Sequence, residues 1–190
     1  MRTYGKDGRC PVFLEIKRKI RRVIVKSRAT VPYQDWHAGL ILHPDRCRTR
    51  FKSSAEEVNY LTFVRLCREI EARPKVLIRY ERESYLSRAD NYARVTFDRK
   101  VSYATAKDWE WDLLPREKRW WAIDTQTGLN REFPGIILEL KTYGDCPTWM
   151  VEMAEHFDLT RCGFSKYFAA IRMESLFSGA TYSDGFETVV

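Results

Sequence analysis

The sequence predicts an α+β domain in which antiparallel strands close into a barrel, or tunnel, around a charged lumen, with a few helices outside it. Three observations favour this class. Several segments alternate between polar and apolar residues with the period of a β-strand. The segments with helical periodicity are few and stand between or after these strands. Most of the strands carry charged residues, mainly Lys and Arg, on one of their two faces.

The composition fits one folded domain with an anionic partner. The 190 residues are 44% hydrophobic and 14% aromatic, which is enough for a buried core. The 33 Lys and Arg residues outnumber the 26 Asp and Glu, and the net charge of +7 favours a phosphate chain, a nucleotide, a nucleic acid or an anionic membrane surface. No stretch is apolar enough for a membrane span. Five cysteines without a CxxC pair favour neither a disulfide framework nor a zinc ribbon, and they fit a reducing cytoplasm.

The N-terminal half predicts a hairpin, a third strand and a helix. Residues 2–5 form a very short first strand, and residues 12–20 alternate as its longer partner. A third strand is expected over 22–30. The capping box at 54–57 opens a helix that ends by Pro74. The core face of this helix is expected to include Val58, Leu61, Val64 and Ile70.

The C-terminal half predicts a long hairpin followed by mixed elements. Residues 75–85 and 92–103 have strand patterns, and the polar turn at 87–91 joins them. The rest is expected to comprise loops with short strands over 108–131, a strand over 136–142, a helix from Pro147 to about His156, a short helix over 165–171, and an irregular tail over 176–190.

Alternation along the strands predicts which charged residues share a face. These are Glu15, Lys17 and Lys19; Lys26 and Arg28; Arg82 with Tyr80; Arg94 with Thr96 and Asp98; and Glu139 with Lys141. One reading is that these are ordinary solvated faces of an antiparallel sheet. The excess of one sign argues against it, because solvated faces usually interleave both signs. Closed inward, such faces form a basic lumen that suits a phosphate chain.

Eight short motifs occur in a fixed order along the chain. They are RTYG (2–5), FLEIK (13–17), VKSR (25–28), YERESY (80–85), RVTFD (94–98), ILELK (137–141), PTW (147–149) and FSKY (164–167). This ordered set resembles the VTC domain, the polyphosphate polymerase domain of the CYTH-like triphosphate tunnel metalloenzymes, over residues 1–175. Family members have strands before the position of Arg2, so the barrel is expected to be N-terminally incomplete, and phosphate binding is a firmer expectation than turnover.

The resemblance implies transfer of the γ-phosphate of ATP to a growing polyphosphate chain, or to pyrophosphate or phosphate, in a tunnel that uses Mn²⁺ or Mg²⁺. Nucleic acid is not expected as a partner. The residues implied as catalytic are Lys17, Lys26, Arg82, Arg94 and Lys166. The same residues bind phosphate with Arg2 and Ser165, and strand alternation adds Lys19, Arg28 and Lys141. Glu139 is the implied metal ligand, with Glu15 as a possible second carboxylate.

Other readings of the same residues remain open. Within the same superfamily, the tunnel could hydrolyse or cyclise a triphosphate. A non-catalytic module could bind polyphosphate or inositol phosphates without turnover. An RNA-binding domain has less support, because no RNP-like strand, KH loop or GxxxxGK loop is present. For single residues, Arg82 and Arg94 could pair with carboxylates across the sheet, and Ser165 could simply cap a helix.

Overall fold

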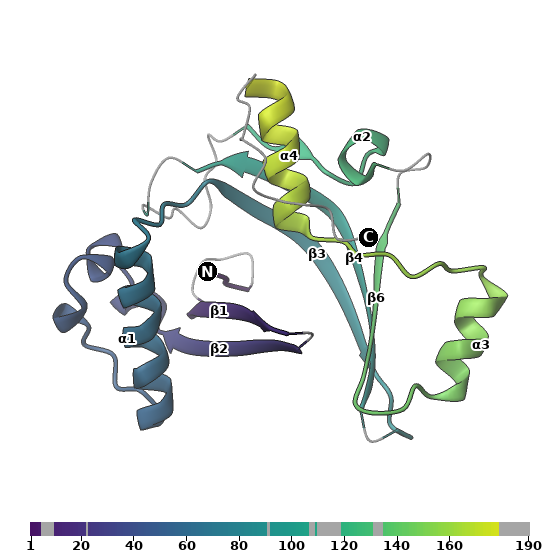
Figure 1. Cartoon of the computed structure of the whole chain (residues 1–190), viewed down its shortest axis with the longest axis horizontal. Helices are drawn as coiled ribbons and strands as arrows, with labels where there is room; N and C mark the ends of the chain where they lie inside the picture. Colours follow the sequence, from purple (N-terminus) through teal and green to yellow (C-terminus); the bar gives the residue numbers. More distant parts are fainter. Residues whose placement is uncertain are drawn as a thin grey trace. The chain divides into compact units, whose positions relative to one another are not determined.

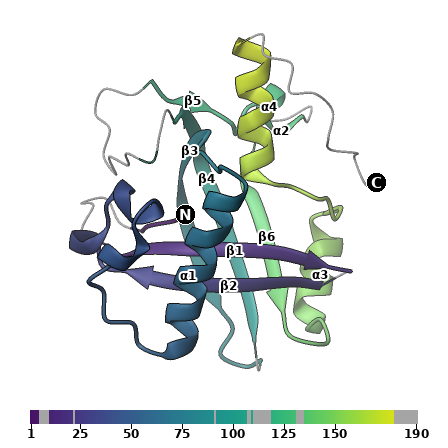
Figure 2. The ribbon, with the colours of Figure 1, turned by 60° about the vertical axis from the view of Figure 1, so that its left-hand side comes forward.

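The computed structural model describes residues 1–4, 10–21, 23–90, 92–106, 109, 119–130 and 135–178, without the side chains of Lys19 and Val23. The chain divides into two compact units, which we describe separately (Figures 1 and 2). The first unit comprises Met1–Pro74 and Ala106–Lys118. The second comprises Lys75–Thr105 and Arg119–Val190.

The first unit is a β-hairpin covered on one face by a helix. Strands β1 (Val12–Ile20) and β2 (Val23–Val31) pair antiparallel. The very short strand expected near the start is present as a single bridge between Arg2 and Phe13. Helix α1 (Ser54–Glu69) runs across both strands (Figure 2). Between the hairpin and α1 lie three short 3₁₀ helices: η1 (Tyr33–Asp35), η2 (Ala38–Ile41) and η3 (Pro44–Arg46).

Helix α1 begins where the capping box predicts, but its buried face differs from the expected one. The Ser53 hydroxyl accepts a hydrogen bond from the backbone N–H of Glu56 and so caps the helix. The expectation for the core face was wrong at three positions: Val58, Leu61 and Ile70 are 60%, 48% and 72% exposed. Two apolar stripes run along this helix, and the stripe with the larger side chains packs against β1 and β2. Its buried residues are Tyr60, Phe63, Val64 and Cys67.

The second unit is a four-stranded antiparallel sheet. Strand β4 (Ala93–Thr105) lies in the middle and pairs with β3 (Val76–Leu86) along one edge. Its other edge pairs with β6 (Ile137–Thr142) and with the two-residue strand β5 (Trp121–Ala122). The long hairpin and the strand over 136–142 are therefore confirmed. The helices are α2 (Gln126–Leu129), α3 (Thr148–His156) and α4 (Lys166–Ser178).

Helices α3 and α4 pack on opposite faces of this sheet. Met150 of α3 packs with Ala93 and Val95, while Ala170 of α4 packs with Val101. Figure 1 shows α4 at one end of the β3–β4 hairpin and α3 beside β6. The register shifts between Arg79 and Glu81, where β4 has one extra residue and Lys100 has φ of 52°. This bulge turns Val101 and Tyr103 toward α4, on the same face as Asp98.

Three further expectations concern the C-terminal tail, the barrel and membrane-spanning segments. Helix α4 runs to Ser178, so the first residues of the expected tail are helical because they continue the helix that packs on the sheet; residues 179–190 lie outside the described residues. The strands form a two-stranded and a four-stranded sheet, and the pairings among described residues include no closed barrel, so barrel closure stays a prediction. In the described part of the chain, no helix combines the length and apolar character needed to cross a bilayer.

Candidate anion-binding site

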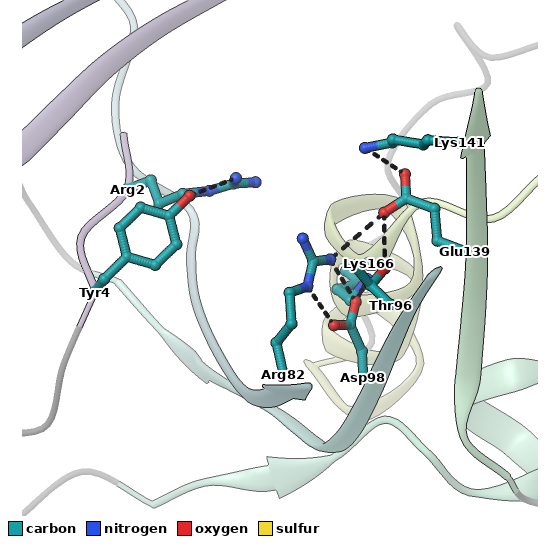
Figure 3. A network of polar contacts seen from close by, with 8 residues as sticks. All are labelled: Arg2, Tyr4, Arg82, Thr96, Asp98, Glu139, Lys141 and Lys166. Atoms are coloured by element: carbon teal, nitrogen blue, oxygen red, sulfur yellow. Dashed lines mark hydrogen bonds and ion pairs between the residues drawn. The ribbon is translucent and has the colours of Figure 1, made fainter. Parts of the chain in front are cut away.

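One face of the β3–β4–β6 sheet carries the charged residues that the sequence places together. The antiparallel register of β3 and β4 sets Arg82 opposite Asp98. It also sets Glu139 of β6 opposite Thr96. Lys166, in the first turn of α4, reaches the same face (Figure 3). Four elements therefore contribute to one polar network.

Asp98 lies at the centre of this network and is fully buried. Arg82 donates to both of its carboxylate oxygens, with Nε to Oδ1 at 2.6 Å and Nη2 to Oδ2 at 2.7 Å. The Lys166 ammonium lies 2.5 Å from Oδ2. Burial by itself would raise the pKa of Asp98, but the hydrogen bonds from Arg82 and Lys166 outweigh it and hold that pKa below its ordinary value. The hydrogen bond to Asp98 in turn raises the pKa of Arg82.

Glu139 is the second carboxylate of this face and is more open to solvent. Its Oε1 lies 2.8 Å from the Lys141 ammonium, and its Oε2 lies 3.6 Å from Arg82 Nη2. Thr96 Oγ1 donates to Oε2 at 3.5 Å. Burial by itself would raise the pKa of Glu139, but the hydrogen bond from Lys141 and the nearby charges of Lys141, Arg82 and Lys166 outweigh it and hold that pKa below its ordinary value. Glu139 is therefore an ionised carboxylate at 39% side-chain exposure.

The fit of Glu139 to a divalent cation depends on how many ligands the protein supplies. Among the described residues, no group of three or more His, Cys, Asp or Glu side chains could hold a metal ion. An all-protein cage is therefore not formed by this part of the chain. A single carboxylate completed by phosphate oxygens does fit, because Mg²⁺ commonly binds through one or two carboxylates and the substrate's phosphates.

Arg94 has no carboxylate partner in the described structure. Its cross-strand neighbour on β6 is a cation, Lys141. Its Nε is buried without a hydrogen-bond partner in the described part of the chain, and its guanidinium lies 5.7 Å from the centre of the Tyr92 ring. The alternative reading, in which a basic residue simply pairs with a carboxylate across the sheet, therefore applies to Arg82 and not to Arg94 among the described residues.

The opposite face of the same strands offers an internal comparison. There, Lys100 pairs with Glu81 at 3.0 Å and Arg99 pairs with Glu83 at 2.6 Å. These pairs match one cation to one carboxylate and are exposed, as on an ordinary solvated surface. On the face of Asp98 and Glu139, the cations outnumber the carboxylates. Among the described residues, two carboxylates face four cations: Arg82, Arg94, Lys141 and Lys166.

The start of α4 supplies Lys166 and is capped by its neighbour. The Ser165 hydroxyl accepts a hydrogen bond from the backbone N–H of Phe168 at 3.3 Å, so Ser165 is the N-cap of the helix. Its hydroxyl proton is still available to donate to an anion. The Lys166 ammonium lies 5.0 Å from the Tyr80 ring centre, which adds a cation–π contact to its ion pair with Asp98.

The first unit has a charged face of its own, on the side of the β1–β2 hairpin opposite α1. Glu15, only 7% exposed, accepts from Arg28 Nε at 2.8 Å and contacts the Lys26 ammonium at 2.7 Å. Burial raises the pKa of Glu15, but the hydrogen bonds from Lys26 and Arg28 bring it below the ordinary value. Lys17 stands directly opposite Lys26. The Lys19 side chain lies outside the described residues.

Arg2 belongs to the same unit and is held by its backbone. Its N–H and C=O exchange hydrogen bonds with Phe13 at 2.9 and 2.7 Å. Its Nη1 donates to the Tyr4 hydroxyl at 3.2 Å (Figure 3), and the Tyr4 ring packs edge-on against Phe13. The guanidinium is thus tied to its own short strand.

Asp98 and Thr96 are the residues that sequence reasoning placed on the charged face without giving them a role. The signal that could have found Asp98 is the hairpin register. A turn centred near 89–90 places residue 82 opposite residue 98, and the stated alternative for Arg82 was a cross-strand carboxylate. The contact of Lys166 with Asp98 has no such local signal, since the two residues are far apart in the chain.

Comparison with known families gives one match. The family model described as the VTC domain matches residues 1–175, which include the charged faces of both units. A search of curated proteins and a search of solved structures found no match.

Proposed function

Because the chain belongs to the VTC domain family, we propose that it is a polyphosphate polymerase-type phosphotransferase that moves the γ-phosphoryl group of ATP to a growing polyphosphate chain. Family membership supports a polyphosphate-related function, and the proposal adds the reaction. The new P–O bond forms between the γ-phosphorus and the terminal oxygen of the acceptor chain. The bond from the γ-phosphorus to the bridging oxygen breaks, and ADP leaves with that oxygen.

The observation that carries the proposal is the excess of cations over carboxylates on the face of β3, β4 and β6. Arg94 and Lys141 are direct cross-strand neighbours, although like charges in that position repel each other. The buried Nε of Arg94 has no partner in the described part of the chain. A ligand with several negative charges would relieve both costs, and phosphate oxygens match the donors of Arg and Lys.

This set of residues suits phosphoryl transfer, because that reaction needs positioning and charge neutralisation more than covalent help. In the proposal, Arg82, Arg94 and Lys166 bind the equatorial oxygens and hold donor and acceptor in line. Glu139 is the proposed ligand of Mn²⁺ or Mg²⁺, which when bound would neutralise charge on the phosphate oxygens. Glu15 as a second ligand remains a prediction, since its Oε1 is already in contact with Lys26 and Arg28.

The proposal includes the closed tunnel that the sequence predicts. Lys17, Lys26 and Arg28 of the β1–β2 hairpin are proposed to contact polyphosphate as well. A long phosphate chain offers these cations more oxygens than tripolyphosphate does. Substituting Lys26 with Gln should weaken binding of long polyphosphate more than binding of tripolyphosphate.

The experiment that tests the reaction is incubation of the purified chain with ATP and Mn²⁺, followed by gel analysis of phosphate chains and measurement of ADP. Chains longer than the primer, formed with equal amounts of ADP, are expected. Inorganic phosphate without chains would instead indicate a hydrolase. Tight polyphosphate binding without ADP would indicate a binding module, and binding of RNA that short polyphosphate fails to displace at the same salt would contradict the substrate class.

A matched pair of variants distinguishes an effect of the proposed site from an effect of the protein's overall positive charge. Arg94→Gln and Arg99→Gln each remove one positive charge from β4, at positions five residues apart. Arg94 lies on the face with the excess of cations, and Arg99 lies on the opposite face with Glu83. We expect loss of chain synthesis for Arg94→Gln and little change for Arg99→Gln. Equal effects of the two variants would contradict the assignment of the face.

A further inference from the structure

The buried carboxylate of Asp98 has a geometry that an ordinary structural ion pair does not need. Both of its oxygens are occupied, by Arg82 from β3 and by Lys166 from α4. The carboxylate is fully buried, whereas the side chains of Arg82 and Lys166 are 24% and 20% exposed. The anion is thus enclosed behind the two cations, and the cations keep a solvent-facing side.

The two cations retain donors beyond those used by Asp98. A guanidinium has five N–H donors and an ammonium has three. Arg82 uses Nε and Nη2 on Asp98, and its Nη1 has no hydrogen-bond partner among the described residues. Glu139 lies 3.6 Å from Arg82 Nη2 and pairs with Lys141, so two carboxylates meet three cations in this network and a net positive charge remains. The ion pairs on the opposite face, Glu81 with Lys100 and Glu83 with Arg99, leave none.

Ordering two long, flexible side chains costs conformational entropy. If they were ordered only when the ligand binds, this cost would reduce the affinity. A bidentate contact holds the guanidinium plane of Arg82 in one orientation. The same carboxylate holds the Lys166 ammonium beside it and offsets the repulsion between the two cations. The Tyr80 ring further limits the motion of both cations. Its centre lies 5.3 Å from the Arg82 guanidinium and 5.0 Å from the Lys166 ammonium.

We infer that Asp98 is a positioning residue of the proposed site: it orients Arg82 and Lys166 so that their remaining donors meet a phosphate chain without rearrangement. This inference rests on the proposed function, because the cations it orients are the proposed phosphate ligands. Asp98 itself contacts no substrate in this arrangement. Its effect on binding passes through the two cations.

Replacing Asp98 with Asn separates positioning from simple charge. The variant keeps the shape of the side chain and makes the protein more positive by one unit. If Asp98 acted only as a negative charge near the site, Asp98→Asn would bind an anion more tightly. If Asp98 positions the cations, the dissociation constant for inorganic tripolyphosphate should rise about tenfold, the equivalent of one charge-assisted hydrogen bond. Calorimetry without metal measures this constant directly.

Glu83→Gln is the matched control. Glu83 lies on the same strand as Arg82, faces the other way, and pairs with Arg99, and its substitution changes the net charge by the same amount. We expect its tripolyphosphate affinity to be unchanged or slightly higher. An affinity of Asp98→Asn that equals or exceeds that of the wild type would overturn the inference and leave the proposed function standing. A wild type that fails to bind tripolyphosphate would overturn both.

A second measurement needs only the wild-type protein, in case Asp98→Asn does not fold. Nitrogen-15 relaxation of the Arg82 Nε–H group, assigned by its disappearance in Arg82→Lys, reports the mobility of the guanidinium. In ligand-free protein we expect an order parameter close to that of rigid backbone, about 0.85. An order parameter typical of a flexible group, below about 0.6, would show that Arg82 is not held in advance and would overturn the inference.

Discussion

Lys17 and Lys26 stand directly opposite each other in the β1–β2 hairpin, on the face turned away from α1. Lys26 contacts Glu15, whereas Lys17 has no ion pair or hydrogen bond to another side chain among the described residues. Like charges in directly opposed positions destabilise a hairpin by roughly 0.2–1 kcal/mol. The arrangement therefore favours an anion on this face at some cost to the ligand-free protein.

Substituting Lys17 with Gln should separate stability from binding. The free energy of unfolding in low salt should stay the same or rise by up to about 1 kcal/mol, because the repulsion with Lys26 is removed. The affinity for polyphosphate should fall. Urea unfolding and calorimetry measure the two quantities. Arg18→Gln is the control, since Arg18 has the opposite orientation on the same strand; an equal loss of affinity there would argue against a specific role for Lys17.

The Glu56 carboxylate connects α1 to strand β2 and to the segment just before the helix. Its Oε1 accepts from the Thr30 N–H at 2.9 Å, and its Oε2 accepts from the Lys52 N–H at 3.0 Å. Glu56→Ala leaves both donors without this acceptor, so the free energy of unfolding should fall by roughly 1–3 kcal/mol. Denaturant unfolding of Glu57→Ala, a change at the adjacent exposed position, should show a much smaller loss. Similar losses in the two variants would contradict this account.

The buried face of α1 can be tested by comparing two apolar residues two positions apart. Phe63 is 8% exposed and Leu61 is 48% exposed. Phe63→Ala should lower the free energy of unfolding by about 3–5 kcal/mol, because it opens a cavity against the hairpin. Leu61→Ala should cost far less. The ranking would be reversed if the helix buried the stripe of Val58 and Leu61.

Stability should depend on pH through Asp98. The pKa of this group is lower in the folded protein than its ordinary value of 3.8. Its contribution is therefore complete above that value and is lost as the pH falls through the lower pKa of the folded state. The difference in free energy of unfolding between wild type and Asp98→Asn should be constant near neutral pH and should shrink below about pH 4. A difference that stays constant down to pH 3 would contradict the assignment.

Local pattern predicted most of the strands and the sides on which their charges lie. β1, the β3–β4 hairpin and β6 appear within about two residues of their expected bounds, because alternation and turn residues are properties of short segments. The same alternation placed Arg94 and Thr96 on one face with Asp98. The local pattern did not predict the buried face of α1. This helix has two apolar stripes, and its sequence alone does not say which of them packs against the sheet.

By itself, then, the sequence determined the antiparallel strands, the cationic faces and the family, since each depends on residue order and on a two-residue period. Tertiary structure decided which charges meet. The register set Arg82 on Asp98 and Arg94 against Lys141, and the packing of α4 brought Lys166 to the same carboxylate. These contacts join residues that are distant in the chain, so their energies depend on how whole elements pack and not on any local pattern.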